Sequence, residues 1–459
     1  MYTIDFQKPI HIHFIGIGGI SMSGLAEILL KEDFTISGSD NKASELTAHL
    51  ESLGAHVVIG QKASNINNSI DLVVYTAAIH PDNPEYAQAV AMNIPMLTRA
   101  ELLGQIMNNY EVPIAISGTH GKTTTTSMAS SVLLQGDMDP TISVGGILPA
   151  IGGNIRVGQS ENFITEACEY TNSFLSFFPK ISVILNIDAD HLDFFKDLDD
   201  IRASFRKFAE LLPADGTLII NGEIPNYEAI SHDLPCQVLT YAVHGDADFT
   251  AENISYDQMG YGSFDCLYKG AFYGHFSLHV PGEHNVSNAL AVIALAHTLK
   301  MNTDTIKKGL LSFTGTDRRF QYKGAIGGVT IIDDYAHHPT EITATLTAAQ
   351  NYPHKTLWCV FQPHTYTRTN ALLKEFAQAL TGADKVVLAP IYAAREVNTI
   401  GITSDDLRKE IEKLGTEVYY LTSFDEIEDF LLENCVHGDL LITMGAGDVV
   451  NIGESLLGQ

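Results

Sequence analysis

The sequence predicts an α/β protein with three domains, and three observations point to this fold class. Short apolar strands alternate with helical stretches along the chain, as in parallel sheets with helices on their faces. The length of 459 residues suits about two to four domains. The alternation also starts afresh twice, so we place the domains at 1–108, 109–316 and 317–459.

The first domain opens with a strand, a glycine turn and an amphipathic helix in residues 9–30. Further strands are predicted in residues 33–40, 55–60 and 71–78, and residues 108–113 form a linker.

The second and third domains repeat this alternation. In the second, a buried helix is predicted over 284–299, after a Pro-Gly turn. The predicted strands of the second domain are 112–117, 162–167, 181–187 and 216–221, and those of the third begin at 329, 356, 385, 417 and 439.

Composition narrows the function classes. Lys and Arg total 27 against 55 Asp and Glu, a net charge of -28, which would repel a nucleic-acid backbone. The five cysteines are scattered, which argues against a disulfide framework or a structural zinc site. No signal peptide is visible, and no apolar run approaches the roughly 20 residues that span a bilayer. We therefore expect a cytoplasmic protein with neither nucleic-acid nor membrane partners.

Residues 117–126, "SGTHGKTTTT", follow a predicted strand and precede a helix, as a phosphate-binding loop does. Lys122 would reach the outer phosphates of ATP, and the hydroxyl of Thr123 or Thr124 would ligate Mg²⁺. The usual pattern has another glycine where Ile116 stands, so the loop is a shortened variant. The alternative is a Gly-Thr turn that only caps a helix. We predict ATP binding.

The first glycine turn is less specific. Gly16, Gly18 and Gly19 follow a strand, but Ser21 occupies the third glycine position of the dinucleotide pattern. Asp40 ends the next strand, where such folds place a ribose-binding acid. The turn alone is compatible with NAD, with a nucleotide sugar or with no ligand, and the neighbouring ATP loop favours a nucleotide-linked substrate.

Polar clusters follow several later strands, where open α/β sheets bind ligands. Glu166 would help Thr123 to hold Mg²⁺. The turn with Asp188, Asp190, His191 and Asp193 is either a solvated acidic turn or a metal site with His191 as ligand. The third domain has two such clusters, one with Asp333, Asp334, Tyr335, His337 and His338 and one with His364 and Arg368.

Taken together, the motifs resemble one enzyme family over almost the whole chain. "GTHGKTTTT", "EACEYTNSF", "NIDADHLD", "PGEHNVSNALA", "GTDRRFQ", "DDYAHHPTEI" and "FQPHTYTRT" occur in this order, after "HFIGIGGISMSGLAEIL". They resemble the Mur ligases of peptidoglycan synthesis, most closely the alanine-adding branch. The resemblance implies a Rossmann-like UDP-binding domain, a central P-loop ATPase-like domain and a Rossmann-like C-terminal domain.

The resemblance also implies a reaction. The enzyme would use ATP and Mg²⁺ to join L-alanine to the carboxylate of UDP-N-acetylmuramate through an acyl phosphate, acting as a monomer or homodimer. Three alternatives stay open: a recycling ligase that joins a peptide to the same sugar, a non-catalytic nucleotide-sugar sensor and an NAD-dependent oxidoreductase.

By the same resemblance, each site residue has an expected role. Lys122, His191 and His337 would be catalytic, and Thr123, Glu166 and His191 would bind metal. ATP would contact Gly118, Thr119, His120, Gly121, Lys122, Thr123, Thr124, Asn285, Asn288, Arg319 and Asp334. The UDP-sugar would contact Gly16, Gly18, Gly19, Asp40, residues 76–79 including Thr76, Arg99 and Glu101, and the amino acid would contact Tyr335, His337, His364 and Arg368.

Three positions depart from the family pattern. Phe205 stands near the place where other members carry a carbamylated lysine, which leaves His191 more important. Thr365 follows His364 where some members have a basic residue. Cys168 replaces an aspartate, so only Glu166 and Glu169 of that acidic motif remain.

Overall fold

The computed structural model describes residues 2–76, 78–192, 194–394 and 396–459. The chain divides into two compact units. The first holds the chain up to Thr126 together with Leu133–Ile187 and Asp199–Thr240. The second holds Ser127–Val132, Asp188–Leu198 and the chain from Tyr241 onward. Within the described ranges, no helix combines the length and apolar character that crossing a membrane requires.

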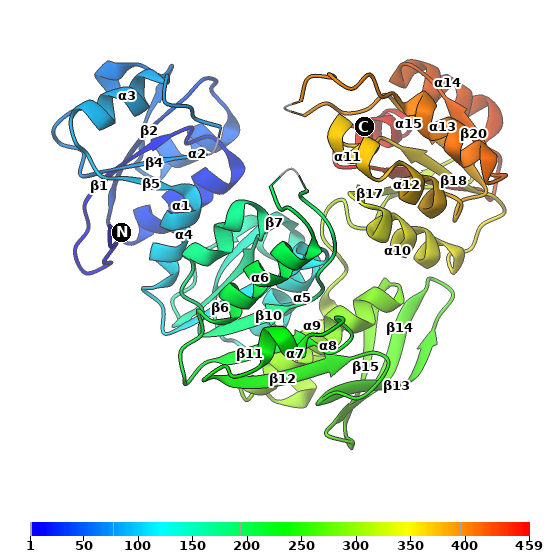
Figure 1. Cartoon of the computed structure of the whole chain (residues 1–459), viewed down its shortest axis with the longest axis horizontal. Helices are drawn as coiled ribbons and strands as arrows, with labels where there is room; N and C mark the ends of the chain where they lie inside the picture. Colours follow the sequence, from blue (N-terminus) through cyan, green and yellow to red (C-terminus); the bar gives the residue numbers. More distant parts are fainter. Residues whose placement is uncertain (1, 77, 193, 395) are drawn as a thin grey trace. The chain divides into compact units, whose positions relative to one another are not determined.

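The first unit begins with a parallel five-stranded sheet in the order β3-β2-β1-β4-β5 (Figure 1). Its order reverses between β1 and β4, and such a reversal opens a crevice at the carboxyl ends of the strands. The strands are β1 His11–Ile15, β2 Thr35–Asp40, β3 His56–Ile59, β4 Leu72–Tyr75 and β5 Met96–Thr98. The helices are α1 Ile20–Lys31, α2 Glu45–Ser52, α3 Pro84–Ala91 and α4 Arg99–Met107.

A second sheet of this unit runs in the order β11-β10-β6-β9-β7-β8. Strands β10, β6 and β9 are parallel, so residues 117, 167 and 184 lie at the same sheet edge. The strands are β6 Val112–Ser117, β7 Thr141–Leu148, β8 Gly153–Arg156, β9 Asn162–Ala167, β10 Ile181–Ile184 and β11 Thr217–Asn221. The helices are α5 Lys122–Gln135, α6 Leu198–Ala209 and α7 Glu228–Ser231.

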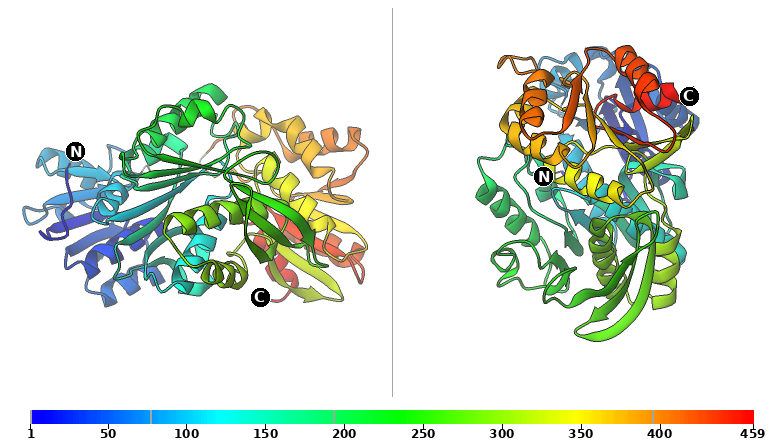
Figure 2. Two further views of the ribbon diagram at one scale, coloured as in Figure 1. Left: turned by 90° about the horizontal axis from the view of Figure 1, so that it is seen from below. Right: turned by 90° about the vertical axis from the view of Figure 1, so that its right-hand side faces the viewer.

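The second unit contains an antiparallel ribbon, seen in green at the bottom of the right-hand view of Figure 2. It comprises β13 Phe249–Tyr256, β14 Tyr261–Tyr268 and β15 Ala271–Pro281, and β12 Gln237–Ala242 pairs with β13. Helix α8 (Glu283–Thr298) begins after Gly282, as the sequence predicts, and buries most of its apolar residues. Helix α9 (Thr303–Ser312) packs against β15.

The last sheet of the second unit runs in the order β16-β17-β21-β18-β19-β20. Only β16 is antiparallel to its neighbour. Its strands are β16 Gln321–Ile326, β17 Val329–Asp334, β18 Leu357–Phe361, β19 Lys385–Leu388, β20 Glu417–Tyr420 and β21 Leu440–Met444. Its helices are α10 Pro339–Gln350, α11 Tyr366–Ala371, α12 Leu373–Leu380, α13 Ser404–Lys413, α14 Phe424–Asn434 and α15 Val450–Leu456. Apolar clusters fill both faces, because parallel strands are buried on both sides.

The strands predicted from the sequence are confirmed, with ends that differ by a few residues. Strands β5, β12 and β16, the pair β7 and β8, and the ribbon β13–β15 were not predicted. Strand β14 alternates buried and partly exposed residues, a period of two that is visible in its sequence. The signal for the ribbon was therefore present, whereas β5, with only three residues, offers too short a pattern.

Candidate nucleotide-binding and ligand-binding sites

The predicted phosphate loop lies between β6 and α5. Gly118 has φ +149°, and a Cβ atom there would stand 2.9 Å from Cβ of Leu185. Gly121 has φ +82°, which also favours glycine because other residues are strained there. The loop therefore needs its two glycines for close packing and for backbone conformation. The absence of a glycine at Ile116 is explained by burial, because that residue belongs to the fully buried part of β6.

Lys122 begins α5 and folds back over the loop. Its Nζ atom donates to the carbonyls of Gly118 (2.5 Å) and Thr119 (3.0 Å) and to Oε2 of Glu169 (3.0 Å). Burial alone would lower the pKa of Lys122, but the carboxylate of Glu169 outweighs it and holds the pKa above its ordinary value. Lys122 is therefore a charged group at the sheet edge where an anion would bind.

The four threonines after Lys122 differ in their surroundings. Thr123 donates to Oε2 of Glu166 (3.0 Å), whereas Thr125 and Thr126 are buried in the core. The other oxygen of Glu166 accepts a hydrogen bond from the amide of Gly145 (2.5 Å). A hydroxyl and a carboxylate side by side form the hard oxygen set that Mg²⁺ prefers, so these residues fit the predicted metal. No cluster of three or more His, Cys, Asp or Glu side chains suited to a metal occurs in the described part of the chain.

Asn186 is a loop contact that the sequence did not predict. Its side chain accepts from the amide of His120 (2.7 Å) and donates to the carbonyl of the same residue (3.0 Å). The backbone carbonyl of Asn186 also accepts from the amide of Thr119 (3.1 Å). The amides of Thr119 and His120, which we expected to face phosphate, are thus used within the protein. The available signal was a polar asparagine near the end of the apolar run 181–187, two residues beyond the last residue of β10.

The glycine turn after β1 is tied to β2. The amides of Gly16 and Ile17 donate to the carbonyl of Ser39, and the amide of Gly18 donates to Oδ2 of Asp40 (2.9 Å). A Cβ atom on Gly18 would stand 2.9 Å from the same Oδ2. Asp40 therefore shapes the turn, and its contact with a ribose stays a prediction. Gly19 is the N-cap of α1 and makes no side-chain cap, so the helix start offers backbone amides.

The other residues predicted for the UDP-sugar lie around β4 and α4. Thr76 follows β4, and its hydroxyl accepts from the amide of Ala78 (3.3 Å). Ala77, within the predicted 76–79 segment, lies outside the described residues. The carboxylate of Glu101 accepts from the amide (2.7 Å) and hydroxyl (2.8 Å) of Thr98, so it caps α4. This capping role accounts for Glu101 without a ligand.

Arg99 and Cys168 lie close enough to influence each other electrostatically. Burial lowers the pKa of Arg99, and the nearby Cys168 opposes that shift. Burial also raises the pKa of the Cys168 thiol, which keeps the thiol neutral at pH 7. A neutral group therefore stands near Lys122 and Arg99 where family members carry an aspartate. Phe205, the residue at the lysine position of other members, is fully buried and packs edge-on against Phe174, so no carbamate can form there.

In the second unit, Arg318 and Arg319 have different surroundings. Arg318 donates to Oδ2 of the fully buried Asp333 (3.0 Å) and to the carbonyls of Gly445 and Gly447. The guanidinium of Arg319 lies 5.2 Å from the ring centroid of Tyr335. Arg318 therefore holds Asp333 and two backbone carbonyls by hydrogen bonds, whereas Arg319 lies over the ring of Tyr335 and acts electrostatically on the buried Asp334.

Asp334 ends β17 beside these arginines. Its carboxylate accepts from the amides of Phe320 (2.7 Å) and Ala336 (2.8 Å). Burial raises the pKa of Asp334 to about 6, although Arg319 opposes the shift. At pH 7 the group is mostly ionised, and it fixes the backbone at Phe320 and at Ala336.

The residues predicted to bind the amino acid lie together in one cluster. The rings of His337 and His364 meet edge-on at 5.7 Å, and His364 stacks on Tyr392 at 5.6 Å. Arg368 donates to Nδ1 of His364 (3.3 Å) and to Oδ1 of Asp190 (3.0 Å).

The charges of this cluster are set by burial and by pairing. Burial lowers the pKa of His337 to about 4, so its ring is neutral at pH 7. Burial alone would raise the pKa of Asp190, but Arg368 and His191 hold it well below its ordinary value.

The acidic turn is therefore an ion-pair partner rather than a solvated loop. The amide of His191 donates to Oδ1 of Asp190 (2.7 Å), and its Nε2 lies 3.8 Å from Oδ2. His191 has φ +54°, which a histidine adopts rarely. Asp193 lies outside the described residues. Metal binding by His191 remains a prediction.

Asn285 and Asn288 lie one turn apart on α8 and are buried. Asn288 donates to Oδ1 of Asn285 (3.1 Å), and Asn285 donates to the carbonyl of Pro281 (2.8 Å). The pair fixes the start of α8, which is compatible with the expected adenine contact.

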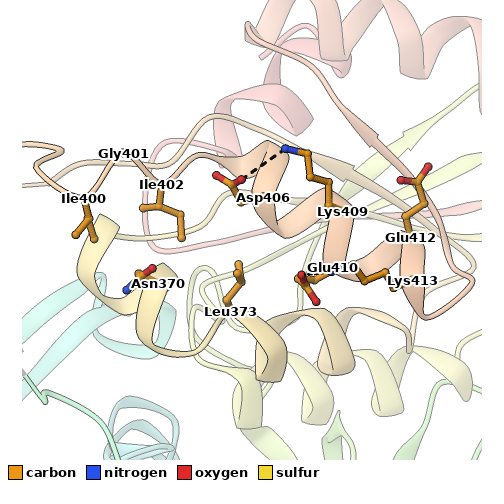
Figure 3. Close-up of a pocket in the computed structure, with 10 residues that line it drawn as sticks. All are labelled: Asn370, Leu373, Ile400, Gly401, Ile402, Asp406, Lys409, Glu410, Glu412 and Lys413. Carbon is orange, nitrogen blue, oxygen red and sulfur yellow. Dashed lines mark hydrogen bonds and ion pairs between the residues drawn. The ribbon is translucent and has the colours of Figure 1, made fainter.

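A cavity of about 730 Å³ lies in the C-terminal sheet region (Figure 3). Figure 3 shows the side chains of Asp406 and Lys409 turned toward each other, with Nζ of Lys409 3.6 Å from Oδ1 of Asp406, whereas Glu412 points away from them. Among the described residues, none of those predicted to bind ligands lines this cavity. The lining residues are Asn370, Leu373, Ile400, Gly401, Ile402, Asp406, Lys409, Glu410, Glu412 and Lys413.

Comparison with family models matches three consecutive segments. Residues 11–111 match the model described as "Mur ligase family, catalytic domain", and residues 116–296 match the Mur ligase middle domain. Residues 318–447 match the model described as "Mur ligase, glutamate ligase domain".

Whole-chain comparisons agree. A UDP-N-acetylmuramate–L-alanine ligase of Agathobacter rectalis is 64% identical over 457 residues, covering 100% of both chains. The crystal structure of UDP-N-acetylmuramate-alanine ligase from Thermotoga maritima is 29% identical, covers 98% of both chains and has a TM-score of 0.80. A structure from Neisseria meningitides named UDP-N-acetylmuramate:L-alanyl-gamma-D-glutamyl-meso-diaminopimelate ligase is 29% identical, covers 68% of this chain and 100% of its own, and has a TM-score of 0.61. The chain therefore belongs to the Mur ligase family.

Proposed function

We propose that the chain is an ATP-dependent ligase that joins L-alanine to the carboxylate of UDP-N-acetylmuramate in peptidoglycan precursor synthesis. The observation that carries the proposal is the phosphate loop, in which Lys122 and the Thr123–Glu166 pair stand together at the carboxyl edge of the central sheet. The similarity to L-alanine ligases over the full chain supports this choice of substrates.

The reaction begins by activating a carboxylate, because hydroxide is a poor leaving group at pH 7. The muramoyl carboxylate attacks the γ-phosphorus of ATP, its oxygen bonds to phosphorus, and ADP leaves. This step brings two anions together, and the ammonium of Lys122 offsets their repulsion. On binding, the phosphates take the place of the carbonyl contacts that Lys122 makes with its own loop.

Mg²⁺ fits this site through Thr123 and Glu166, whose oxygens lie 3.0 Å apart. The ion supplies positive charge for the transferring phosphoryl group. The amide of Gly145 holds the Glu166 carboxylate in place. The carboxylate can come this close because Gly145 has no side chain, since a Cβ atom there would stand 3.1 Å from both carboxylate oxygens.

The second step forms the amide. The neutral amine of L-alanine attacks the acyl carbon, the nitrogen of the tetrahedral intermediate gives up one proton to the phosphate group or to water, and the C–O bond to phosphate breaks to release inorganic phosphate. With a pKa near 4, His337 is neutral but a weak base, so it serves better as a hydrogen-bond acceptor that orients the amine. Arg368 would bind the alanine carboxylate while sharing its guanidinium with Asp190.

Phosphate release from ATP and Mg²⁺ with UDP-N-acetylmuramate tests this proposal, with and without L-alanine. Release that depends on both substrates supports the ligase. Release with L-alanyl-γ-D-glutamyl-diaminopimelate in preference to L-alanine would identify a recycling ligase. Absence of release with every combination, together with UDP-sugar binding, would favour a sensor. A cytoplasmic location and a monomeric or homodimeric state complete the proposal.

A further inference from the structure

Asn186 follows β10 and extends the pairing between β10 and β6 beyond the strands. The amide of Leu185 donates to the carbonyl of Ser117 (2.9 Å), and the amide of Thr119 donates to the carbonyl of Asn186 (3.1 Å). The backbone ladder therefore reaches the second residue of the phosphate loop. At His120 the side chain of Asn186, and no longer the backbone, makes the hydrogen bonds to the loop.

The primary amide of Asn186 bonds both peptide groups of His120. Its Oδ1 accepts from the His120 amide (2.7 Å), and its Nδ2 donates to the His120 carbonyl (3.0 Å). Among side chains of this length, only the amide of asparagine offers one acceptor and one donor in this arrangement. Aspartate would lose the donor, and a hydroxyl is too short to reach both peptide groups.

These bonds fix where the loop turns into α5. The amides of Thr119 and His120 are occupied, whereas the first N–H groups of a helix have no partner within the helix. An anion would therefore be bound by the backbone amides at the start of α5, where Lys122 also lies. A close approach at Gly118 supports the same conclusion, because a Cβ there would lie 3.2 Å from the amide nitrogen of Asn186.

We propose that Asn186 is a positioning residue for nucleotide binding, which acts by holding His120 so that the start of α5 faces the phosphates. This inference rests on the proposed ATP-dependent function. The side chain of Asn186 acts through the loop, without touching substrate or metal itself.

Asn186→Ala tests the inference, and Asn221→Ala is the matched control. Asn221 is the last residue of β11, and its side chain donates to the carbonyl of Leu185 (3.0 Å). It therefore supports the same segment without touching the loop. For Asn186→Ala we expect KM for ATP, and Kd for a non-hydrolysable ATP analogue measured by calorimetry, to rise at least about tenfold. KM for UDP-N-acetylmuramate and for L-alanine should change less than about twofold. A similar Kd for the analogue in Asn186→Ala and Asn221→Ala would overturn the inference.

Amide hydrogen exchange without nucleotide gives a second readout that does not depend on activity. In Asn186→Ala, the amide of His120 should exchange at least about tenfold faster than in the native protein, because its acceptor is removed. In Asn186→Asp, which keeps an oxygen acceptor for this amide, and in Asn221→Ala, the rate should change less than in Asn186→Ala. Unchanged exchange in Asn186→Ala would contradict the inference even if that variant binds nucleotide poorly. Native protein that binds the analogue but releases no phosphate would instead overturn the ligase reaction, and the Kd ratio would still decide the role of Asn186.

Discussion

The Nζ atom of Lys122 lies 3.0 Å from Oε2 of Glu169, and both side chains are largely withdrawn from solvent, with 15% and 2% exposed. The two residues are separated by 47 positions and lie beyond neighbouring parallel strands, β6 and β9. The ion pair keeps the lysine charged before any nucleotide arrives. The contribution of this ion pair to stability can be measured separately from the contribution of Lys122 to phosphate release.

Lys122→Met should lower the rate of phosphate release at least about 10³-fold, because it removes the cation that faces the transferring phosphoryl group. It should also destabilise the fold by about 3 kcal/mol, since the buried Glu169 carboxylate loses its lysine. The double variant Lys122→Met with Glu169→Gln should recover part of that stability and none of the activity. Urea denaturation and steady-state kinetics measure the two effects. Strictly additive stability losses would show that the pair is not coupled.

Thr123 and Glu166 should determine the Mg²⁺ requirement. Thr123→Ala and Glu166→Gln should each raise the Mg²⁺ concentration for half-maximal phosphate release by at least about tenfold, because the first removes a hydroxyl ligand and the second replaces a charged carboxylate by a neutral amide. Thr123→Ser keeps the hydroxyl and serves as the control. Magnesium titrations at saturating ATP give the comparison. If Thr123→Ala needs no more Mg²⁺ than Thr123→Ser, the hydroxyl does not bind the metal.

The adjacent arginines should separate stability from nucleotide binding. Arg318→Ala should lower the free energy of unfolding by about 2–4 kcal/mol, because the fully buried Asp333 loses its cation. Arg319→Ala should cost less stability than Arg318→Ala, because the Asp334 carboxylate that Arg319 faces keeps the amides of Phe320 and Ala336 as donors, but it should raise KM for ATP. Denaturant titrations and ATP kinetics on the two variants check this. An equal loss of stability in both would contradict the assignment.

His337 and Asp334 should give opposite slopes in the pH dependence of stability. The folded pKa of His337 is lowered to about 4, so the unfolded chain binds more protons and stability falls as the pH drops through the window from about 6.5 to 4. The folded pKa of Asp334 is raised to about 6, so the native state binds more protons and stability rises as the pH drops from about 6 to 4.

His337→Gln should therefore lose less stability on acidification than the native protein, by on the order of 3 kcal/mol between pH 6.5 and 4. Asp334→Asn should lose more stability on acidification than the native protein, because the stability that Asp334 adds at low pH is removed. The exposed His56, changed to Gln, is the control. Urea denaturation across this pH range gives the three slopes. Parallel curves for His337→Gln and His56→Gln would refute the contribution of His337.

Much of the fold and many of the predicted groups follow from local sequence. Apolar strands alternate with helices because each element must bury one face, and the glycine-lysine-threonine turn after β6 is typical of a phosphate-binding loop. The division of the four threonines needed the structure, since the sequence does not tell which helix face is buried. The ribbon β13–β15 was missed because the alternation of β14 was not weighed against the α/β rhythm.

Only the tertiary structure decided which distant residues meet. The order β10-β6-β9 brings Asn186 and Glu169 to the two sides of one loop, and the segment with Asp190 joins Arg368, 178 positions away. Neighbouring strands in a parallel sheet are chosen by long-range packing, which local patterns do not encode. The sequence by itself determined the chemistry of the loop and its likeness to a ligase family. The three-dimensional fold decided how Lys122, His120 and Arg368 are held, because their partners lie on other strands and turns.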